Sequence, residues 1–425
     1  MRLLVVGGGG REHALVRQLA QSPSVDRVFA APGNPGIAEQ ATCLPVAAHD
    51  LAGIAAAADR ESIDLTVVGP EGPLVGGLVD ELESRGHRAF GPRRAAARIE
   101  GSKAWTKDLC GRYGIPAGRS RAFTEMGPAV EYLDALEPPY VVKADGLAAG
   151  KGVVIAESRA DAIAALEASL VERVFGPAGT TVLVEEHLQG PEVSAFALTD
   201  GRTVLPLVMA QDFKRVGEGD RGPNTGGMGA YSPVPFVDES TARSIWEQVI
   251  ERAVRAMSSE GVTYRGVLYA GVMLTEDGPK LLEFNARFGD PETEVILPRL
   301  DSDLAELLRA AAEGTLAGRR AEWSARACVT VVLASGGYPG RPATGLPISG
   351  LSGAGEVEGV VVFHAGTAER EGRVVTSGGR VLMVSGLGAD LAQARARAYE
   401  GCARISFEGM QFRRDIAQRV TGEDR

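Results

Sequence analysis

Residues 281–292, LLEFNARFGDPE, set three polar side chains at alternate positions of an otherwise apolar stretch. Alternate side chains of a β-strand share a face, so Glu283, Asn285 and Arg287 would lie in one row. Leu282 and the other apolar side chains would then face the core. A carboxylate and an amide oxygen suit a hard divalent cation such as Mg²⁺, and the planar guanidinium suits a carboxylate or phosphate. The alternative is the solvated face of an edge strand, but the rigid turn GDPE that follows favours a functional site.

A second stretch, VVKADGLAAGKGVVIA at residues 141–156, is similar to a phosphate-binding P-loop but departs from it twice. Three residues instead of four separate Gly146 from Gly150, and Gly152 follows Lys151 where a P-loop has Ser or Thr. Runs of β-branched residues flank the stretch on both sides, whereas a P-loop opens a helix. The pattern therefore predicts a glycine-rich loop between two strands.

The N-terminal GGGGREHA, residues 7–14, follows an apolar run and opens a helical pattern. Free amide groups and the helix dipole favour an anion at such a turn. A dinucleotide fingerprint is not completed, because its last small residue falls on Glu12 or His13, and APGNPG (31–36) offers no carboxylate for a ribose. A phosphate or substrate contact survives as a hypothesis. The alternative is a tight turn that needs only one or two of the glycines.

TVLVEEHLQGPE, residues 181–192, is an apolar strand that ends in glutamates. Glu185 and the backbone near Leu188 are placed to pair with the edge of an adenine, and Glu192 to accept the hydroxyls of a ribose. Glutamates at a strand end are more often simply solvated, so this hypothesis depends on the other motifs.

QDFKRVGEGDRGPNTGGMGAYSP, residues 211–233, puts Asp212 and Lys214 on one strand face and then opens a long glycine loop. Such a loop is either an element that contacts substrate or a flexible excursion. Lysine is informative in this chain, because only six of its 45 basic residues are lysines. The rare lysine beside the glycines favours a substrate contact.

Composition limits the class of protein. The net charge of −10 and the 5% of aromatic residues argue against a nucleic-acid surface. The four cysteines have no metal-like spacing, no signal peptide is recognisable, and no apolar run approaches the ~20 residues that span a bilayer. We expect a reduced, soluble, cytoplasmic protein with no membrane or nucleic-acid partner.

The elements that must position these motifs form more than one domain. Strand-like runs alternate with helical patterns over residues 1–100, which predicts a parallel α/β sheet. A helix over 102–114 begins at an N-cap serine, and strands surround helices between 120 and 300. Strand-rich residues 329–388 and a last helix predict a separate, mostly antiparallel C-terminal domain.

The order of these parts resembles the ATP-grasp superfamily, in which two α+β subdomains hold ATP and a glycine hairpin closes over its phosphates. GGGGREHAL, GSKAWTKDLC, KADGLAAGKGVVIA, NTGGMGAYSP and EFNARFGDPETE are similar to the phosphoribosylamine–glycine ligases in particular. The similarity runs from residue 1 to the C-terminal sheet. It implies a Rossmann-like domain at 1–102, an ATP-grasp domain at 103–320 with 120–190 as a mobile lid, and a C-terminal domain at 325–425.

The resemblance implies an ATP-dependent ligase that joins glycine to 5-phosphoribosylamine through a glycyl phosphate, with Mg²⁺ or Mn²⁺, in a monomer or dimer. The catalytic residues would be Arg287, Asp212 and Lys214, and the metal ligands Glu283 and Asn285. Nucleotide contacts would be Lys103, Lys143, Gly150, Lys151, Gly152, Glu185, Glu186, Leu188 and Glu192. Substrate contacts would be Gly9, Gly10, Asn34, Gly229 and Asp290.

One departure and two rival classes stay open. Many ATP-grasp enzymes take a second metal carboxylate from the preceding strand, but position 271 is Gly, which leaves the number of metal ions and a role for Glu292 open. Another ATP-grasp ligase or a carboxylase is the near rival. A dinucleotide-dependent oxidoreductase or a non-catalytic nucleotide sensor is the rival from another class.

Overall fold

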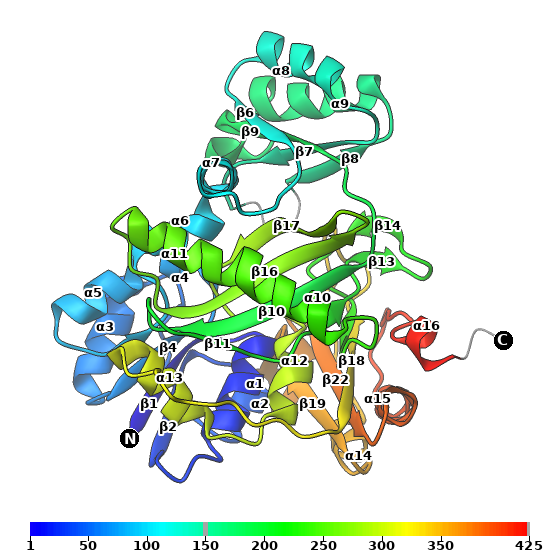
Figure 1. Ribbon diagram of the computed structural model, residues 1–425. Coiled ribbons are helices and arrows are strands. Elements are labelled where there is room, and N and C mark those ends of the chain that lie inside the picture. Colours follow the sequence, from blue (N-terminus) through cyan, green and yellow to red (C-terminus); the bar gives the residue numbers. More distant parts are fainter. Residues whose placement is uncertain (148–151, 423–425) are drawn as a thin grey trace.

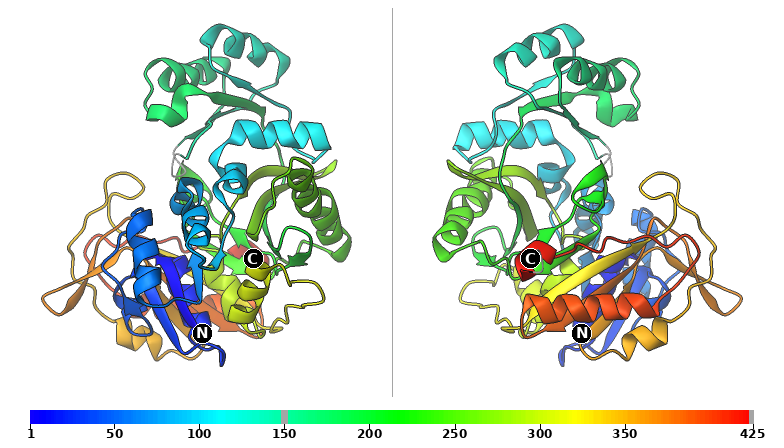
Figure 2. Two further views of the ribbon diagram at one scale, coloured as in Figure 1. Left: turned by 90° about the vertical axis from the view of Figure 1, so that its left-hand side faces the viewer. Right: turned by 90° about the vertical axis from the view of Figure 1, so that its right-hand side faces the viewer.

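The computed structural model describes residues 1–147 and 152–422. Their strands form four sheets of four or five strands and two short hairpins. In Figure 1 the subdomain of residues 120–186, the expected lid and called the lid below, stands at the top, the N-terminal sheet lies at lower left and the C-terminal strands at lower right. Figure 2 shows the same separation of the lid from the other regions in two further directions. No helix of the described chain has the length and apolar character to cross a bilayer.

The N-terminal region is a parallel five-stranded sheet of order β3-β2-β1-β4-β5, as the strand–helix alternation predicts. Its central strands are buried on both faces, because helices cover both sides. Its strands are β1 (Arg2–Gly7), β2 (Arg27–Pro32), β3 (Thr42–Cys43), β4 (Leu65–Val68) and β5 (Ala89–Phe90). Its helices are α1 (Gly10–Leu19), α2 (Pro35–Ala38), α3 (Leu51–Arg60), α4 (Glu71–Gly76), α5 (Leu78–Ser84) and α6 (Arg94–Gly101).

Helix α7 (Lys103–Tyr113) leads into the lid and has the predicted ends. The Ser102 hydroxyl accepts from Trp105 N, and Gly114 closes the helix at φ 64°. The lid is an antiparallel sheet of order β6-β9-β7-β8 with helices on it. Its elements are β6 (Ser120–Phe123), α8 (Met126–Tyr132), η1 (Leu133–Ala135), β7 (Tyr140–Ala144), β8 (Val153–Ala156), α9 (Arg159–Leu166), η2 (Glu167–Val171), η3 (Gly176–Thr180) and β9 (Val182–Glu186).

Strands β7 and β8 pair antiparallel, with Lys143 opposite Val153, so the strands on either side of the glycine stretch pair as predicted for a β-hairpin. The central sheet below it has the order β11-β10-β16-β17 and carries LLEFNAR on its edge strand. Helices α10 and α11 cover one face and α13 packs against the other. The elements are β10 (Glu192–Thr199), β11 (Val204–Pro206), α10 (Glu239–Ile245), η4 (Trp246–Ile250), α11 (Glu251–Ser259), β16 (Gly266–Thr275), β17 (Gly278–Asn285), α12 (Thr293–Ile296), η5 (Leu297–Arg299) and α13 (Leu304–Glu313).

The regular alternation expected along β17 is broken at one residue. Glu283 pairs with Gly271, whereas Leu281 pairs with Val272, so Leu282 has no partner across the ladder. Such a bulge changes which face the next side chain takes. Leu281 is therefore fully buried, and Leu282, expected in the core, lines a cavity.

The C-terminal strands do not form a sheet of their own. Their sheet has the order β12-β15-β18-β22-β19, and its first two strands come from the glycine-loop segment between 211 and 232. A sheet thus crosses the boundary expected near residue 320. The elements are β12 (Gln211–Asp212), β13 (Arg215–Gly217), β14 (Arg221–Asn224), β15 (Gly229–Ser232), β18 (Ala327–Ala334), α14 (Leu351–Gly355), β19 (Val360–His364), β20 (Thr367–Arg370), β21 (Arg373–Thr376), β22 (Arg380–Gly388), α15 (Leu391–Arg404) and α16 (Gln418–Thr421).

Candidate active site

A cavity of about 440 Å³ lies where the lid, the central sheet, the N-terminal region and the C-terminal strands meet. Residues from α6, α7, β7, β9, β17 and the glycine loop line it, together with Tyr338 and Arg380 from beyond residue 320. Four segments far apart in the sequence therefore share one wall. Its cations form two groups: the lysines come from α7, β7 and the glycine-loop segment, which we call the lysine half, and the arginines come from α1, the stretch just after β17 and β22, which we call the arginine half.

Strand β17 brings the three polar side chains of LLEFNAR to this cavity. Glu283, Asn285 and Arg287 all line it, although the strand itself ends at Asn285. Alternate residues of a strand share a face, so these three side chains lie in one row. The bulge at Leu282 turns this row toward the lysine half of the cavity and away from the core of the sheet.

Four of the six lysines of the chain line the same cavity: Lys103, Lys107, Lys143 and Lys214. Lys103 Nζ donates to Gly146 O at 3.0 Å, at the root of the hairpin. Lys143 Nζ donates to Glu185 Oε2 at 2.8 Å and to Leu282 O at 3.5 Å. Their clustering supplies the positive charge that a triphosphate requires.

Lys107 is the residue of this set that motif reasoning missed. Its ammonium lies 3.4 Å from Glu185 Oε1 and donates to Leu281 O at 3.4 Å. Burial raises the pKa of Glu185, but Lys143 and Lys107 outweigh it, so that the pKa of this carboxyl lies below its usual value. The scarcity of lysine in this chain was the signal that could have identified Lys107.

Glu283 is half-buried among cations. Burial raises its pKa, but Lys214, Lys143 and Lys103 outweigh burial and the net shift is downward. The group is thus an anion at neutral pH. With the Asn285 amide two places along it forms an oxygen donor pair on the cavity wall.

This donor pair fits a divalent metal whose other ligands are phosphate and water. Within residues 1–147 and 152–422 there is no cluster of three or more His, Cys, Asp or Glu side chains that would enclose an ion. Gly271 lies next to Glu192, because a Cβ there would be in ordinary contact with Glu192 Oε1 at 3.4 Å. One oxygen of Glu292 already accepts from the Tyr269 and Ser194 hydroxyls, at 2.6 and 3.1 Å.

Asp212 and Lys214 lie side by side on the cavity wall, as their spacing predicts. Lys214 Nζ bonds Glu192 Oε1, so Glu192 lies behind the lysine. Burial raises the pKa of Asp212 well above its usual value, and Glu292 and Glu192 raise it further against the opposing effect of Lys214. Asp212 is therefore a carboxyl with a strong tendency to take up a proton.

Arg287 marks the arginine half. Its Nε donates to Glu71 Oε2 at 3.3 Å, and its Nη2 lies 3.6 Å from Glu100 Oε1. Glu100 also accepts from Ala286 N at 2.7 Å, and burial raises its pKa to about 7 although Arg287 opposes the shift. Glu71 and Glu100 were not predicted; the first comes from the N-terminal sheet region and the second ends α6.

Asp290 joins this half to the N-terminal glycines. It is paired with Arg380 at 3.1 Å, and its other oxygen accepts from Arg11 N at 3.4 Å. Gly9 and Gly10 lie beside it at the start of α1, but the Gly9 N–H already donates to Glu12 Oε2 at 2.6 Å. Gly10 has no room for a side chain, because a Cβ would lie 2.4 Å from Glu294 Oε1. Close packing therefore explains why at least one residue of the GGGG run, Gly10, is a glycine.

Seven predicted contacts are not part of the cavity wall that the described residues form: Gly9, Gly10, Asn34, Glu186, Leu188, Glu192 and Gly229. The Asn34 amide is occupied by Gly8 O, His364 O and Ile37 N. Gly229 lies in β15, where a Cβ would meet Thr330 O at 2.6 Å. Glu186 is paired with Arg119 at 2.8 Å, and Leu188 is half-buried against Gly118. Gly150 and Lys151 lie outside the described residues, whereas Gly152 lines the cavity.

Comparisons with known proteins agree along the whole chain. The three domain models of phosphoribosylglycinamide synthetase match it, the N domain at residues 1–100, the ATP-grasp (A) domain at 101–293 and the C domain at 328–419. The phosphoribosylamine–glycine ligase of Agrobacterium fabrum is 48% identical over 425 residues, which is the full length of both chains. This chain belongs to the phosphoribosylamine–glycine ligase family.

Other members of the phosphoribosylamine–glycine ligase family agree with this assignment. That of Caldanaerobacter subterraneus subsp. tengcongensis is 48% identical over 98% of this chain and 99% of its own. The crystal structure of the enzyme from Thermotoga maritima has a TM-score of 0.87 at 35% identity, over 98% of this chain and 100% of that one. A biotin carboxylase from Campylobacter jejuni has a TM-score of 0.75 at 15% identity, over 97% and 92%, which shows the shared fold alone.

Proposed function

We propose that this chain is an ATP-dependent ligase that joins glycine to 5-phosphoribosylamine and releases ADP and phosphate. The observation that carries the proposal is the cavity in which Glu283 and Asn285 face four lysines beneath a β-hairpin. An oxidoreductase would need the dinucleotide fingerprint that the N-terminal turn lacks. A nucleotide sensor would not need the row of Glu283, Asn285 and Arg287.

The chemistry explains the charge pattern. An oxygen of the glycine carboxylate attacks the γ-phosphorus of ATP, the bond from that phosphorus to ADP breaks, and glycyl phosphate forms. The sugar amine then attacks the acyl carbon, phosphate leaves, and the amine loses a proton. Each ion pair at ~4 Å contributes roughly 4 kcal/mol at an effective dielectric of ~20, so that several cations are required around these anions.

In this proposal Lys103 and Lys143 hold phosphate oxygens, and Lys143 with Glu185 marks the position of the adenine. Lys214 is close to the transferred phosphoryl group, and Arg287 orients the glycine carboxylate or its phosphate. Glu283 and Asn285 hold Mg²⁺ or Mn²⁺, which would neutralise phosphate charge when bound. The two protein oxygens favour Mg²⁺, because that ion keeps several phosphate and water ligands.

Asp212 is the proposed acceptor for the proton that the amine loses. Burial and the neighbouring carboxylates raise its pKa, and its place on the wall beside Lys214 puts it near the transferred group. No side chain acts as a covalent nucleophile in this scheme. Positioning of the two substrates supplies much of the rate, and the lid keeps water from the acyl phosphate.

The test is ADP release with ATP, Mg²⁺, glycine and phosphoribosylamine formed in place from ribose 5-phosphate and ammonia. We expect turnover only with the complete mixture, and a product of the mass of glycinamide ribonucleotide. ADP release that does not depend on glycine or on the sugar amine would contradict the proposal. Replacing Mg²⁺ by Mn²⁺ at equal concentration then compares the two ions.

A further inference from the structure

The C-terminal region contributes two side chains to the cavity, Tyr338 from the turn after β18 and Arg380 from β22, and both bond the backbone of one glycine-loop residue, Gly226. Gly226 N donates to the Tyr338 hydroxyl at 3.0 Å. Arg380 Nη1 donates to Gly226 O at 2.5 Å. The N–H and the C=O of Gly226 are thus bound from one region, and we call this arrangement the Tyr338–Arg380 clamp.

The clamp is braced by close packing that only glycines permit. A Cβ on Gly226 would lie 2.9 Å from the Arg380 guanidinium carbon, and one on Gly379 would lie 2.3 Å from the Tyr338 ring. Gly227 has φ +109°, and a Cβ there would meet Pro291 at 2.4 Å. The glycine loop is therefore packed against the C-terminal strands at this point and is not a flexible excursion.

Hydrogen bonds and an ion pair connect the clamp to two parts of the cavity wall, the Lys214 backbone and Asp290. On one side Thr225 precedes the clamped glycine, and its backbone N–H and hydroxyl both bond Lys214 O, at 2.7 and 2.9 Å. On the other side Arg380 donates to Asp290 O at 2.8 Å and pairs with the Asp290 carboxylate at 3.1 Å. Asp290 in turn bonds the start of α1 through Arg11 N.

We propose that the Tyr338–Arg380 clamp is a positioning device that assembles the sugar-amine end of the cavity, a role for the C-terminal region in substrate binding. The inference rests on the proposed function. The clamp contacts Asp290 and the glycine loop, which form the wall next to α1. Among the described residues, the α7 and β7 lysines bond the hairpin root, Glu185 and the β17 main chain and neither clamp side chain, so the nucleotide end does not depend on the clamp.

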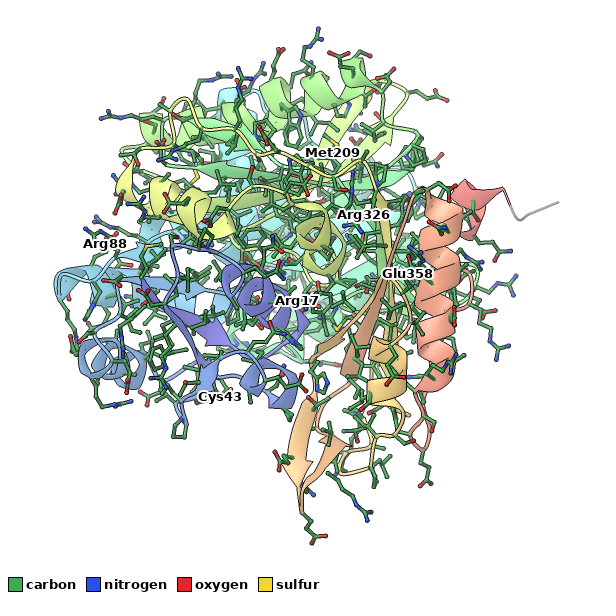
Figure 3. The ribbon with its side chains drawn as sticks, turned by 90° about the horizontal axis from the view of Figure 1, so that it is seen from below. Arg17, Cys43, Arg88, Met209, Arg326 and Glu358 are labelled. Carbon is green, nitrogen blue, oxygen red and sulfur yellow. The ribbon has the colours of Figure 1, made fainter. Side chains whose placement is uncertain are left out.

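The experiment compares three variants of the full chain: Arg380→Ala, Tyr338→Phe and the control Arg397→Ala. Arg397 also holds one carbonyl and one carboxylate, Leu387 O at 2.6 Å and Glu358 at 2.7 Å, outside the cavity wall of the described chain. Glu358 is marked in Figure 3 among the C-terminal strands near α15. Tyr338→Phe removes a single hydroxyl and keeps the ring, so it provides a second variant if Arg380→Ala fails to fold.

Calorimetry would measure the dissociation constants of ATP with Mg²⁺ and, separately, of glycinamide ribonucleotide, a stable ligand for the sugar-amine end. We expect the constant for glycinamide ribonucleotide to rise about tenfold in Arg380→Ala and about threefold in Tyr338→Phe. ATP binding should change less than twofold, and Arg397→Ala should change neither. Arg380→Lys should not restore binding, because one ammonium cannot bridge the same acceptors as a guanidinium.

Equal losses for both ligands, unchanged binding of glycinamide ribonucleotide, or the same effect from Arg397→Ala would each overturn the inference. These outcomes are separable from failure of the proposed function. A wild-type chain without glycine-dependent and sugar-amine-dependent ADP release refutes the function. An active wild type without the selective loss refutes the clamp alone.

Discussion

Glu283 is an anion because of its neighbours. Partial burial alone would raise the pKa of this carboxyl, since loss of solvent penalises the charged form. Lys214, Lys143 and Lys103 reverse that penalty and lower its pKa. Glu283 in turn stabilises the charged lysines, because they would repel one another without its carboxylate. Removing its charge therefore alters both the oxygen donor and the field around the lysines.

We expect Glu283→Gln to lower kcat by roughly 100-fold or more with little loss of fold, because the ionised ligand of the proposed metal site is removed. Coupled measurement of ADP release and the thermal midpoint would test this. Glu276→Gln is the matched control, because that exposed residue lies just after β16 in the turn that leads to β17. Activity within threefold of wild type for Glu283→Gln would show that the metal site lies elsewhere.

Lys107 carries a second prediction at the residue scale. Its ammonium and that of Lys143 share the Glu185 carboxylate, so Lys107→Met leaves Glu185 with one cationic partner. We expect the KM for ATP to rise about tenfold, equivalent to ~1.4 kcal/mol, with a smaller change in the KM for glycine.

Initial rates with each substrate varied in turn provide the measurement for Lys107→Met. Lys280→Met is the control, because Lys280 pairs with the exposed Asp277 at 3.1 Å. An unchanged KM for ATP in Lys107→Met would place the adenine away from Glu185.

At the scale of elements, helix α7 and the root of the hairpin are joined end to end. Asp145, which follows β7, accepts from Ala104 N at 2.6 Å and from the Ser102 hydroxyl at 3.1 Å. Lys103 N donates to Asp145 O at 3.3 Å. Two free amides at the start of the helix are thus satisfied by the side chain and the main-chain oxygen of Asp145. The position of the hairpin root is thereby tied to the helix that carries Lys103 and Lys107.

We expect Asp145→Ala to lower the free energy of unfolding by about 1 kcal/mol, the usual effect of losing a capping side chain, and to weaken ATP binding several-fold. Urea denaturation and ATP titration would measure the two effects. Asp390→Ala is the control, because Asp390 caps α15 through Gln393 N at 2.8 Å, away from the lid. It should lower stability alone. Equal ATP affinity in both variants would contradict a coupling between cap and hairpin.

At the scale of the whole molecule, the first and last regions meet at two buried histidines. His364 N donates to His13 Nδ1 at 2.8 Å, and Asn34 donates to His364 O at 2.8 Å. Burial lowers the pKa of His13 to about 3 and that of His364 to about 4. In the unfolded chain both would titrate near ~6.5. Between about pH 6.5 and 4 the unfolded chain therefore binds more protons than the folded one.

The sign follows from proton linkage: the free energy of unfolding falls as the pH is lowered through this window, by up to about 2.7 kcal/mol per pH unit for two protons. The variant His13→Asn/His364→Asn should show a shallower fall, because asparagine does not titrate and keeps an acceptor for His364 N. Urea denaturation from pH 4.5 to 7 would measure the slopes. The exposed His49→Asn is the control. Equal slopes for wild type and the double variant would contradict this account.

Local pattern predicted the parallel N-terminal sheet, the ends of α7 and the hairpin at 141–156, because each depends on residues close in sequence. The bulge at Leu282 was not predictable in this way, since it is defined by the register against β16. Asn34 is the opposite case: local sequence suggested a ligand contact, and tertiary packing uses the side chain for something else. Its residue type suited a ligand, but its amide is used by groups up to 330 positions away.

By itself the sequence determined which chemistry is available: a carboxylate–amide–guanidinium row, a few lysines at informative places and a glycine hairpin that is not a P-loop. Only the tertiary structure decided that Lys107 and Glu100 share the cavity, and that the clamp closes it from beyond residue 320. The physical reason is that spacing along a chain sets the faces of single elements. Contacts between elements depend on how several sheets pack around one cavity, which no local pattern encodes.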